Sequence, residues 1–223
     1  MKKHRIAALL MASAIVFGTA GASVSAATAD SETVLAGGWE INRGSLPVSS
    51  DSYIEEAFGK AVEADTDFKY QPIAYIGSQV VAGRNICVLC RKTDVNDENH
   101  VQIQLVYIYA DLKGNAEITG RKTIIGDVLP GGFAANRDKL KLSSNKEVYD
   151  AFAKAAQGSR TKFRPIAYLG SQVVAGNNYL ILCRTKSEKE KPYSFSLVTV
   201  YADLEGNAEI TNIEKLSPGT YDD

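Results

Sequence analysis

The 223-residue sequence is poor in the residues that carry most catalytic and metal-binding chemistry. It contains two histidines, one of them at position 4, and three cysteines. Histidine is a frequent general base and metal ligand, so its scarcity argues against an enzyme and against a metal centre. Three cysteines cannot form a dense disulfide framework. The sequence also lacks a phosphate loop or cofactor fingerprint, and we expect no catalytic residues, no metal and no cofactor.

The charge is nearly balanced, with 25 basic and 26 acidic residues and a net charge of -1. Nucleic-acid-binding domains are usually strongly basic, so we expect no nucleic-acid partner. Hydrophobic residues make up 45% of the chain, which is too high for a wholly disordered protein. The composition therefore predicts a folded, soluble protein, which we expect to be a monomer.

The N-terminus has the three parts of a secretory signal peptide. A basic start at residues 2–5 precedes an apolar run over residues 6–20 and a small-residue stretch that ends at Ala26. The apolar run is shorter than the roughly 20 residues of a membrane-spanning helix, which disfavours an uncleaved anchor. We predict a signal peptide over residues 1–26 and a secreted, mildly acidic mature protein with no membrane segment.

The mature sequence contains one unit twice. Residues 72–83 recur at 165–176 with one difference, and residues 109–119 recur at 201–211 with one difference. A repeat of this length is too long for a solenoid and fits the duplication of a whole small domain. The sequence therefore predicts two copies of one fold.

Glycine and proline cluster near the junction of the two copies, around residues 123–130. Such clusters punctuate elements and mark linkers. We accordingly predict a first domain over residues 27–123 and a second domain over residues 124–223.

Each copy is predicted to contain one helix followed by strands. Apolar residues at helical spacing form one stripe in each copy: Ile54, Ala57, Phe58, Ala61 and Val62, then Val148, Ala151, Phe152, Ala155 and Ala156. Ser52 with Glu55, and Ser144 with Glu147, have capping-box spacing. β-Branched and aromatic runs predict four strands in the first copy, at residues 68–78, 84–91, 101–110 and 116–123. The predicted class is α+β, with one helix packed across a small antiparallel sheet in each domain.

Several features resemble sites, but we interpret them as structural. Cys87 and Cys90 have redox or zinc spacing, yet in a strand an odd separation points them to opposite faces. We expect them and Cys183 to be ordinary strand residues, with a Cys90–Cys183 bridge left open. We expect His100 to be a solvated loop residue, residues 186–191 to form a soluble hairpin loop, and the C-terminal tail to be disordered.

The sequence Gln-Val-Val-Ala-Gly occurs at residues 79–83 and again at 172–176, at a predicted hairpin tip. A glycine pair precedes the helix in each copy. This combination resembles the cystatin family of reversible inhibitors of papain-like cysteine proteases, over residues 35–120 and 129–216. The resemblance implies two cystatin-like domains of the kind without disulfides.

The resemblance also implies a three-part inhibitory edge in each copy: a trunk around a glycine, a first hairpin and a second hairpin. In the first copy these are Gly37 and Gly38, then Gln79, Val80, Val81, Ala82 and Gly83, then Leu112. In the second copy they are Gly131 and Gly132, then Gln172, Val173, Val174, Ala175 and Gly176, then Leu204. Many secreted members carry Pro-Trp in the second hairpin, whereas Asp111-Leu112 and Asp203-Leu204 stand here.

These residue types suit a convex wedge that fills a concave protease cleft. Glycine permits a tight tip, the small apolar residues fill apolar subsites, and Gln79 can hydrogen-bond the cleft wall. We therefore expect a non-enzymatic inhibitor that binds up to two papain-like cysteine proteases per chain. The alternative is a non-inhibitory binding module for a surface protein or a glycan, which the altered second hairpin favours.

Overall fold

Each repeat folds into a short strand, a 3-10 turn, one α-helix and four longer strands, as a computed structural model shows for residues 37–187 and 193–219. The first half comprises β1 (Trp39–Ile41), η1 (Val48–Ser50), α1 (Ser52–Glu63), β2 (Phe68–Val81), β3 (Gly83–Asp94), β4 (Val101–Ala110) and β5 (Ala116–Ile125). The second comprises β6 (Ala134–Ala135), η2 (Leu142–Ser144), α2 (Lys146–Ala156), β7 (Lys162–Val174), β8 (Gly176–Lys186), β9 (Ser194–Ala202) and β10 (Ala208–Lys215). The predicted signal peptide, most of the charged loop at 186–191 and the last four residues lie outside the described residues.

The predicted apolar stripes are confirmed, but the predicted helix caps are wrong. In α1, Ile54, Ala57, Phe58 and Ala61 are buried. The cap of α1 is Asp51, whose carboxylate accepts from the amides of the second and third helical residues. The cap position of α2 is Asn145, which makes no side-chain cap bond; its side-chain amide donates to the carbonyl oxygens of residues 139 and 141.

Each half forms one five-stranded antiparallel sheet. The strands follow the order β1-β2-β3-β4-β5 in one sheet and β10-β9-β8-β7-β6 in the other. All four strands predicted for the first half are present. β4 has the predicted bounds, and the other three extend beyond their predicted ends. The β2–β3 hairpin turns at its tip with Val81 opposite Gly83, and β7–β8 turns in the same way with Val174 opposite Gly176.

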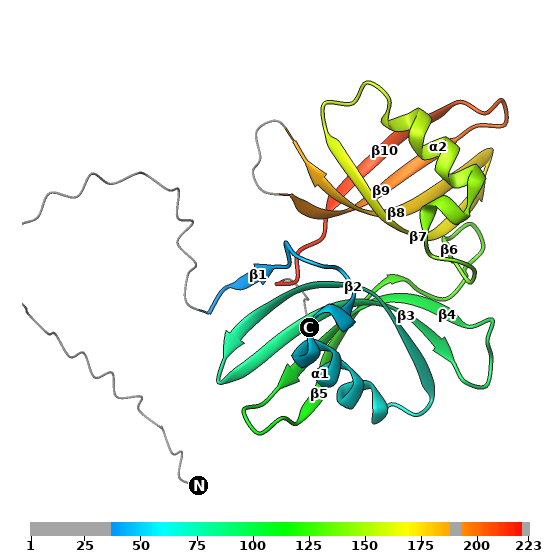
Figure 1. Cartoon of the computed structure of the whole chain (residues 1–223). Coiled ribbons are helices and arrows are strands. Elements are labelled where there is room, and N and C mark those ends of the chain that lie inside the picture. The colour runs from blue at the N-terminus through cyan, green and yellow to red at the C-terminus, as the bar shows by residue number, and fades with distance from the viewer. Residues whose placement is uncertain (1–36, 188–192, 220–223) are drawn as a thin grey trace, which may run out of the picture. The chain divides into compact units, whose positions relative to one another are not determined.

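The prediction of two cystatin-like α+β domains, each a helix across a small sheet, is wrong. Strands dominate the described residues, with ten strands against two α-helices. Each helix covers only one face of its sheet, since α1 packs on one apolar cluster and α2 on another. The remaining faces of both sheets meet in a single cluster, shared by the two halves. Figure 1 shows the two sheets between α1 and α2, so residues 37–219 contain layered sheets around a common core.

The physical reason for this correction lies in the central strands. Residues 86–90 of β3 are all buried, and so are residues 103–108 of β4. Because side chains alternate between faces of a strand, a fully buried run needs cover on both faces. One helix covers only one face, so the second face has to be covered by the other half of the chain.

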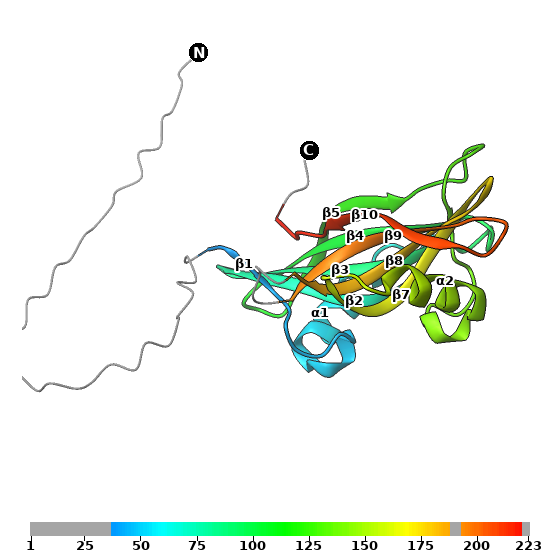
Figure 2. The ribbon, with the colours of Figure 1, turned by 90° about the horizontal axis from the view of Figure 1, so that it is seen from above.

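Reciprocal arginine contacts fix the direction in which the halves meet. Arg91, near the end of β3 remote from its hairpin tip, donates to the carbonyl oxygens of Asn136 and Asp138 at 3.1 and 2.8 Å. Arg184, at the corresponding end of β8, donates to the carbonyl oxygens of Asn42 and Gly44 at 2.9 and 2.8 Å. The tip-remote end of each sheet therefore lies beside the start of the other half. The hairpin tips of the two halves consequently lie at opposite ends, as Figure 2 also shows for β1 and the turn between β9 and β10.

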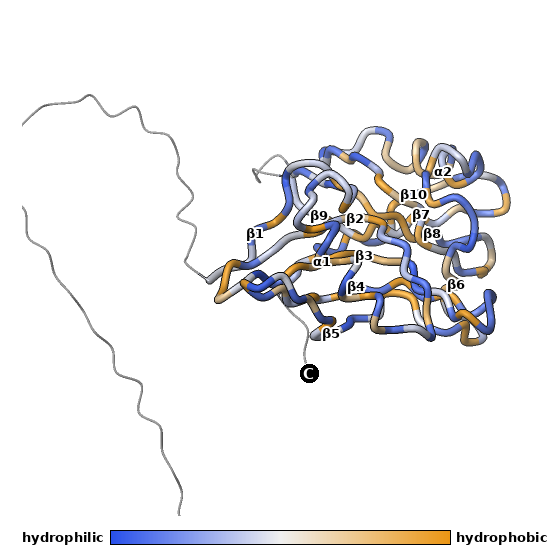
Figure 3. Tube along the Cα trace, turned by 60° about the horizontal axis from the view of Figure 1, so that its bottom comes forward, coloured by the Kyte–Doolittle hydropathy of each residue, from blue (hydrophilic) through white to orange (hydrophobic). Residues whose placement is uncertain are grey.

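Hydropathy follows this layering. In Figure 3 the hydrophobic stretches of the chain run mainly along the strands, and hydrophilic stretches collect in many of the turns. None of the helices in the described ranges is both long enough and apolar enough to cross a bilayer.

The shared core predicts that the two halves unfold together. Leu182 is fully buried in the common cluster from the second half, and Trp39, the only tryptophan, packs against it from the first half. We expect Leu182→Ala to lower stability by about 2–5 kcal/mol and to move the urea midpoint of Trp39 fluorescence together with that of far-UV circular dichroism.

The matched control is Leu204→Ala, the same substitution in the same half at a side chain that is 83% exposed. Its effect should stay within about 0.5 kcal/mol. An unchanged Trp39 midpoint in Leu182→Ala, with circular dichroism split into two transitions, would show that the halves are independent.

Candidate functional site

The residues predicted to form each inhibitory edge are brought together at one end of their sheet. The first edge consists of Gly37, Gly38, Gln79, Val80, Val81, Ala82, Gly83 and Leu112. The second edge consists of Gly131, Gly132, Gln172, Val173, Val174, Ala175, Gly176 and Leu204. In the first edge, Trp39 pairs with Gln79 across β1 and β2, and Arg84 pairs with Ala110 across β3 and β4. The trunk and both hairpin turns of the first half therefore lie side by side, and the same pairings recur in the second half.

Both edges present large apolar side chains to solvent. In the first edge, Val80, Val81 and Leu112 are 66%, 41% and 85% exposed. In the second edge, Val173, Val174 and Leu204 are 78%, 43% and 83% exposed. Single exposed apolar residues are common on proteins, but a group of them on one rim is typical of an interaction surface. The duplicated exposure identifies the tips as binding candidates.

The glycine that ends each first hairpin is required by the close approach of the second hairpin. Gly83 has φ +124°, and a Cβ added there would lie 2.4 Å from the carbonyl oxygen of Ala110. Gly176 has φ +116°, and its Cβ would lie 2.2 Å from the carbonyl oxygen of Ala202. No side chain fits at either position without moving backbone, so the two hairpins pack edge against edge only because glycine stands there.

The glutamine of each edge holds the trunk to the first hairpin. Gln79 donates its amide to the carbonyl oxygen of Gly37 at 2.5 Å, and its oxygen accepts from Asn85 at 2.8 Å. Gln172 donates to Gly131 at 2.6 Å and accepts from Asn178 at 2.8 Å. The role expected for Gln79 at a cleft wall thus differs from what the structure shows, because its carboxamide is engaged within the chain.

A tyrosine joins the two hairpins of each edge. The hydroxyl of Tyr109 donates to the carbonyl oxygen of Ala82 at 2.5 Å, and that of Tyr201 donates to Ala175 at 2.5 Å. Sequence reasoning did not assign these tyrosines to the site. The repeat could have pointed to these tyrosines, because they begin the segments that recur at residues 109–119 and 201–211.

The acid at the start of each second hairpin closes the loop on itself. Asp111 accepts from the backbone amides of Lys113 and Asn115 and from the side-chain amide of Asn115, each at 2.8 Å. The Asn115 side chain holds the pKa of Asp111 below its ordinary value. Asp203 makes the same clasp with Asn207, which lowers its pKa too. This clasp fixes the turn from which the neighbouring leucine projects.

A helix lysine ties each second hairpin to the rest of its half. Lys60 of α1 donates to the carbonyl oxygen of Gly114 at 2.8 Å, and Lys154 of α2 donates to that of Gly206 at 2.8 Å. Sequence reasoning also missed these two lysines, whose helix faces carried no chemical motif. Each edge is therefore braced by its own trunk, hairpins and helix, which leaves little freedom at the tips.

The cysteines are buried strand residues, as predicted. Cys87 points into the core between the sheets, whereas Cys90 lies under α1 and Cys183 under α2. All three thiols are free, and the separate clusters exclude the Cys90–Cys183 bridge that the sequence left open. Burial raises the pKa of Cys183 to about 12 and raises the pKa of Cys87 and Cys90 as well. Within the described ranges no cluster of three metal-ligating side chains occurs.

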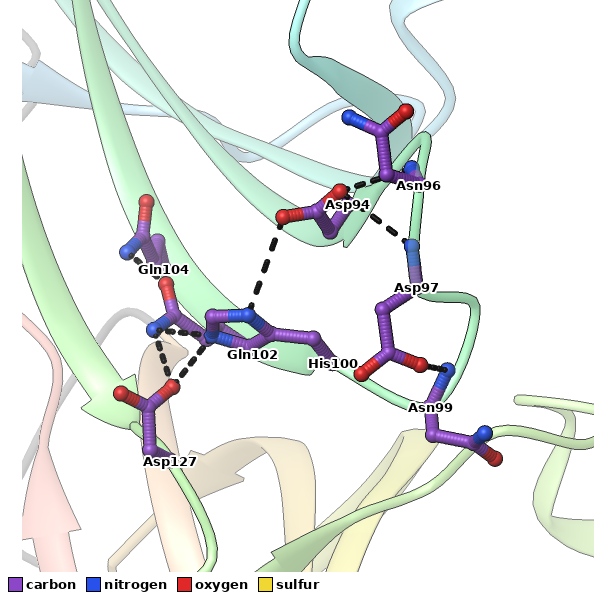
Figure 4. Close-up of polar contacts among 8 residues, drawn as sticks. All are labelled: Asp94, Asn96, Asp97, Asn99, His100, Gln102, Gln104 and Asp127. Carbon is purple, nitrogen blue, oxygen red and sulfur yellow. Dashed lines mark hydrogen bonds and ion pairs between the residues drawn. The ribbon is translucent and has the colours of Figure 1, made fainter.

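The expectation that His100 is simply solvated is wrong. Figure 4 shows its ring between two carboxylates, with Nε2 hydrogen-bonded to Asp127 at 2.5 Å. Gln102 donates to the same oxygen of Asp127 at 2.7 Å. The bonds from Gln102 and His100 hold the pKa of Asp127 below its ordinary value. The polar loop before β4 is thus attached to the segment that links the halves.

The glycine geometry predicts unequal costs for two alanine substitutions in the first edge. Gly37 has φ +88° with nothing within 4 Å of its Cβ position, so Gly37→Ala should cost about 1–2 kcal/mol of unfolding free energy. Gly83→Ala should cost clearly more, because the clash with Ala110 adds to the positive φ. Urea denaturation of both variants measures the difference, and equal losses would contradict the close packing of the hairpins.

Burial of the thiols predicts that the native chain is inert to a disulfide reagent such as Ellman's reagent. We expect no rapid reaction before unfolding and three equivalents after it. Leu112→Cys, at a position that is 85% exposed, supplies the positive control and should add one fast equivalent. A fast thiol in the unsubstituted native chain would show that a cysteine is accessible.

Comparison with models of known protein families finds none that matches this chain. Comparison with curated proteins likewise finds no sequence similar enough to count as a relative. The functional proposal therefore depends on the residues of the two edges themselves.

Proposed function

We propose that the chain is a secreted, reversible inhibitor of papain-like cysteine proteases, and that each edge fills the active-site cleft of one protease molecule. The observation that carries this proposal is the three-part apolar edge, which the chain builds twice with the same residues at the same places. Turn formation alone accepts many residue types. Identical exposed tips therefore suggest a common binding task that both copies perform.

The proposed mechanism is steric: each edge occludes the active-site cleft of the protease. Burying one valine side chain contributes roughly 1.5–3 kcal/mol, and each edge offers two valines and a leucine. Three adjacent segments suit a standard interface of about 800 Å² per partner. Because hydrogen bonds within the chain already fix the tips, little conformational entropy is lost on binding. No reactive group of the inhibitor is needed.

The arrangement of the halves supports binding of two proteases at once. The first and second edges lie at opposite ends of the joined sheets, since each arginine clamp joins the tip-remote end of one sheet to the start of the other half. A protease bound at one edge therefore leaves the other edge open. This supports two binding sites per chain.

A non-inhibitory binding module for a surface protein or a glycan is the second candidate. It is favoured by the second hairpin, where Asp111 and Asp203 close the turn and leave a single leucine exposed at each tip. A module of this kind would use the same edges without blocking a protease, so inhibition separates the two candidates.

Titration against active-site-counted papain tests the proposal. We expect two equivalents of papain per chain for the parent protein. Val81→Asp and Val174→Asp should each leave one equivalent, and the double variant should leave none, because a charge would be buried in an apolar subsite. Both valines are more than 40% exposed, so the melting temperature should change little.

The matched control is Ile213→Asp, at a position on β10 that is 42% exposed and belongs to neither edge. It should retain two equivalents. Full inhibition by the double variant would show that the hairpins are not the contact surface. Absence of inhibition by the parent chain at micromolar concentration would favour the non-inhibitory module.

A further inference from the structure

The trunk of the second edge is an internal segment of the sequence, between β5 and β6. Contacts with the first half hold this segment in place. Resting on the proposed function, we infer that Asp127, His100 and Gln102 are positioning residues that set the trunk of the second edge for its partner, and that the sequence of the first copy lacks the residues from which an equivalent anchor could be built.

The anchor is a carboxylate with two donors. One oxygen of Asp127 accepts from His100 Nε2 at 2.5 Å and from Gln102 Nε2 at 2.7 Å. His100 precedes β4 and Gln102 lies within it, so both donors belong to the sheet of the first half. Figure 4 shows Asp127 beside His100 and Gln102. Asp127 immediately precedes Val128 and Leu129, which lead into the trunk glycines. Two charge-assisted bonds to one atom restrain the chain at this point.

A second attachment lies beyond the trunk. Arg137 donates to the side-chain oxygen of Asn99 at 2.8 Å. The loop that carries Asn99 is itself held in shape, since Asp94 accepts from the amides of Asn96 and Asp97, and Asp97 accepts from the amide of Asn99. The same ordered loop of the first half therefore fastens the trunk before and after its glycines.

Between these attachments the trunk presents apolar side chains outward. Val128 is 57% exposed and Leu129 is 69% exposed. The carbonyl oxygen of Gly131 is held by Gln172, as described above. A trunk fixed at Asp127, at Gly131 and at Arg137 presents its apolar residues in one arrangement. Such pre-organisation strengthens binding by reducing the ordering that binding requires.

The anchor is specific to the second edge. In the alignment of the two copies, Thr33 stands in the first copy where Asp127 stands in the second. Pro192 and Ser194 stand in the second copy where His100 and Gln102 stand in the first. Proline has no donor, and threonine has no carboxylate to accept two bonds. The two edges, otherwise alike, therefore differ in the residues that could form this anchor.

The test measures inhibition of papain through the second edge alone. In the Val81→Asp background, which silences the first edge, we expect Asp127→Ala to raise the inhibition constant for papain about threefold to tenfold. Joint replacement of His100 and Gln102 by alanine should reproduce this rise. Asp127→Asn should restore most of the affinity, because an amide oxygen still accepts both hydrogen bonds.

Hydrogen exchange of the same full-length variants gives a readout that does not depend on a protease. Amides of residues 128–133 should exchange faster in Asp127→Ala than in Asp127→Asn, while amides of β4 stay protected. In the Val174→Asp background, Asp127→Ala should leave inhibition through the first edge unchanged.

The proposed anchor would be contradicted if Asp127→Ala changed neither the inhibition of papain nor the amide exchange. It would also be contradicted if Asp127→Ala weakened inhibition equally at both edges. If the parent chain inhibits no papain, the proposed function fails, while the exchange of residues 128–133 still decides whether Asp127 positions the trunk.

Discussion

The apolar contact between the two sheets is the constraint on which the rest of the structure depends. Each sheet has one face covered by its helix and one face that only the other half can cover. Joining these faces buries apolar surface of both sheets, and burial of apolar surface is the dominant favourable term in folding. It also decides the direction of each half, since Arg91 and Arg184 reach the backbone that begins the opposite half.

The edges are the places where this packing ends. Beyond the common core the strands run out into hairpins whose tips bury no apolar side chains against the rest of the chain. Hydrogen bonds take over there: Gln79 holds the trunk, Tyr109 joins the hairpins and Lys60 ties the outer turn to α1. The exposed valines and leucine are thus carried on a rigid frame, which is the property that a docking surface needs.

Local patterns in the sequence predicted much of the fold and most of the edge. The helix stripes and strand runs follow periodicities of 3.6 and 2 residues, which depend on near neighbours alone. The tip residues were found because they recur. The caps were missed because the cap positions are Asp51, one residue before the expected serine, and Asn145, one residue after the expected serine. His100 was misjudged because its partner, Asp127, is 27 residues away in the sequence.

The sequence by itself determined the duplication, the order of the helix and the four longer strands, and the apolar tips, since these are carried by residue identity and short spacing. Only the tertiary structure decided what covers the second face of each sheet, because Leu89 and Leu105 lie in a cluster that includes residues of the other copy. It also decided that the edges lie at opposite ends and that the first half holds the second trunk. Those properties depend on contacts between residues far apart in the chain, which periodicity does not encode.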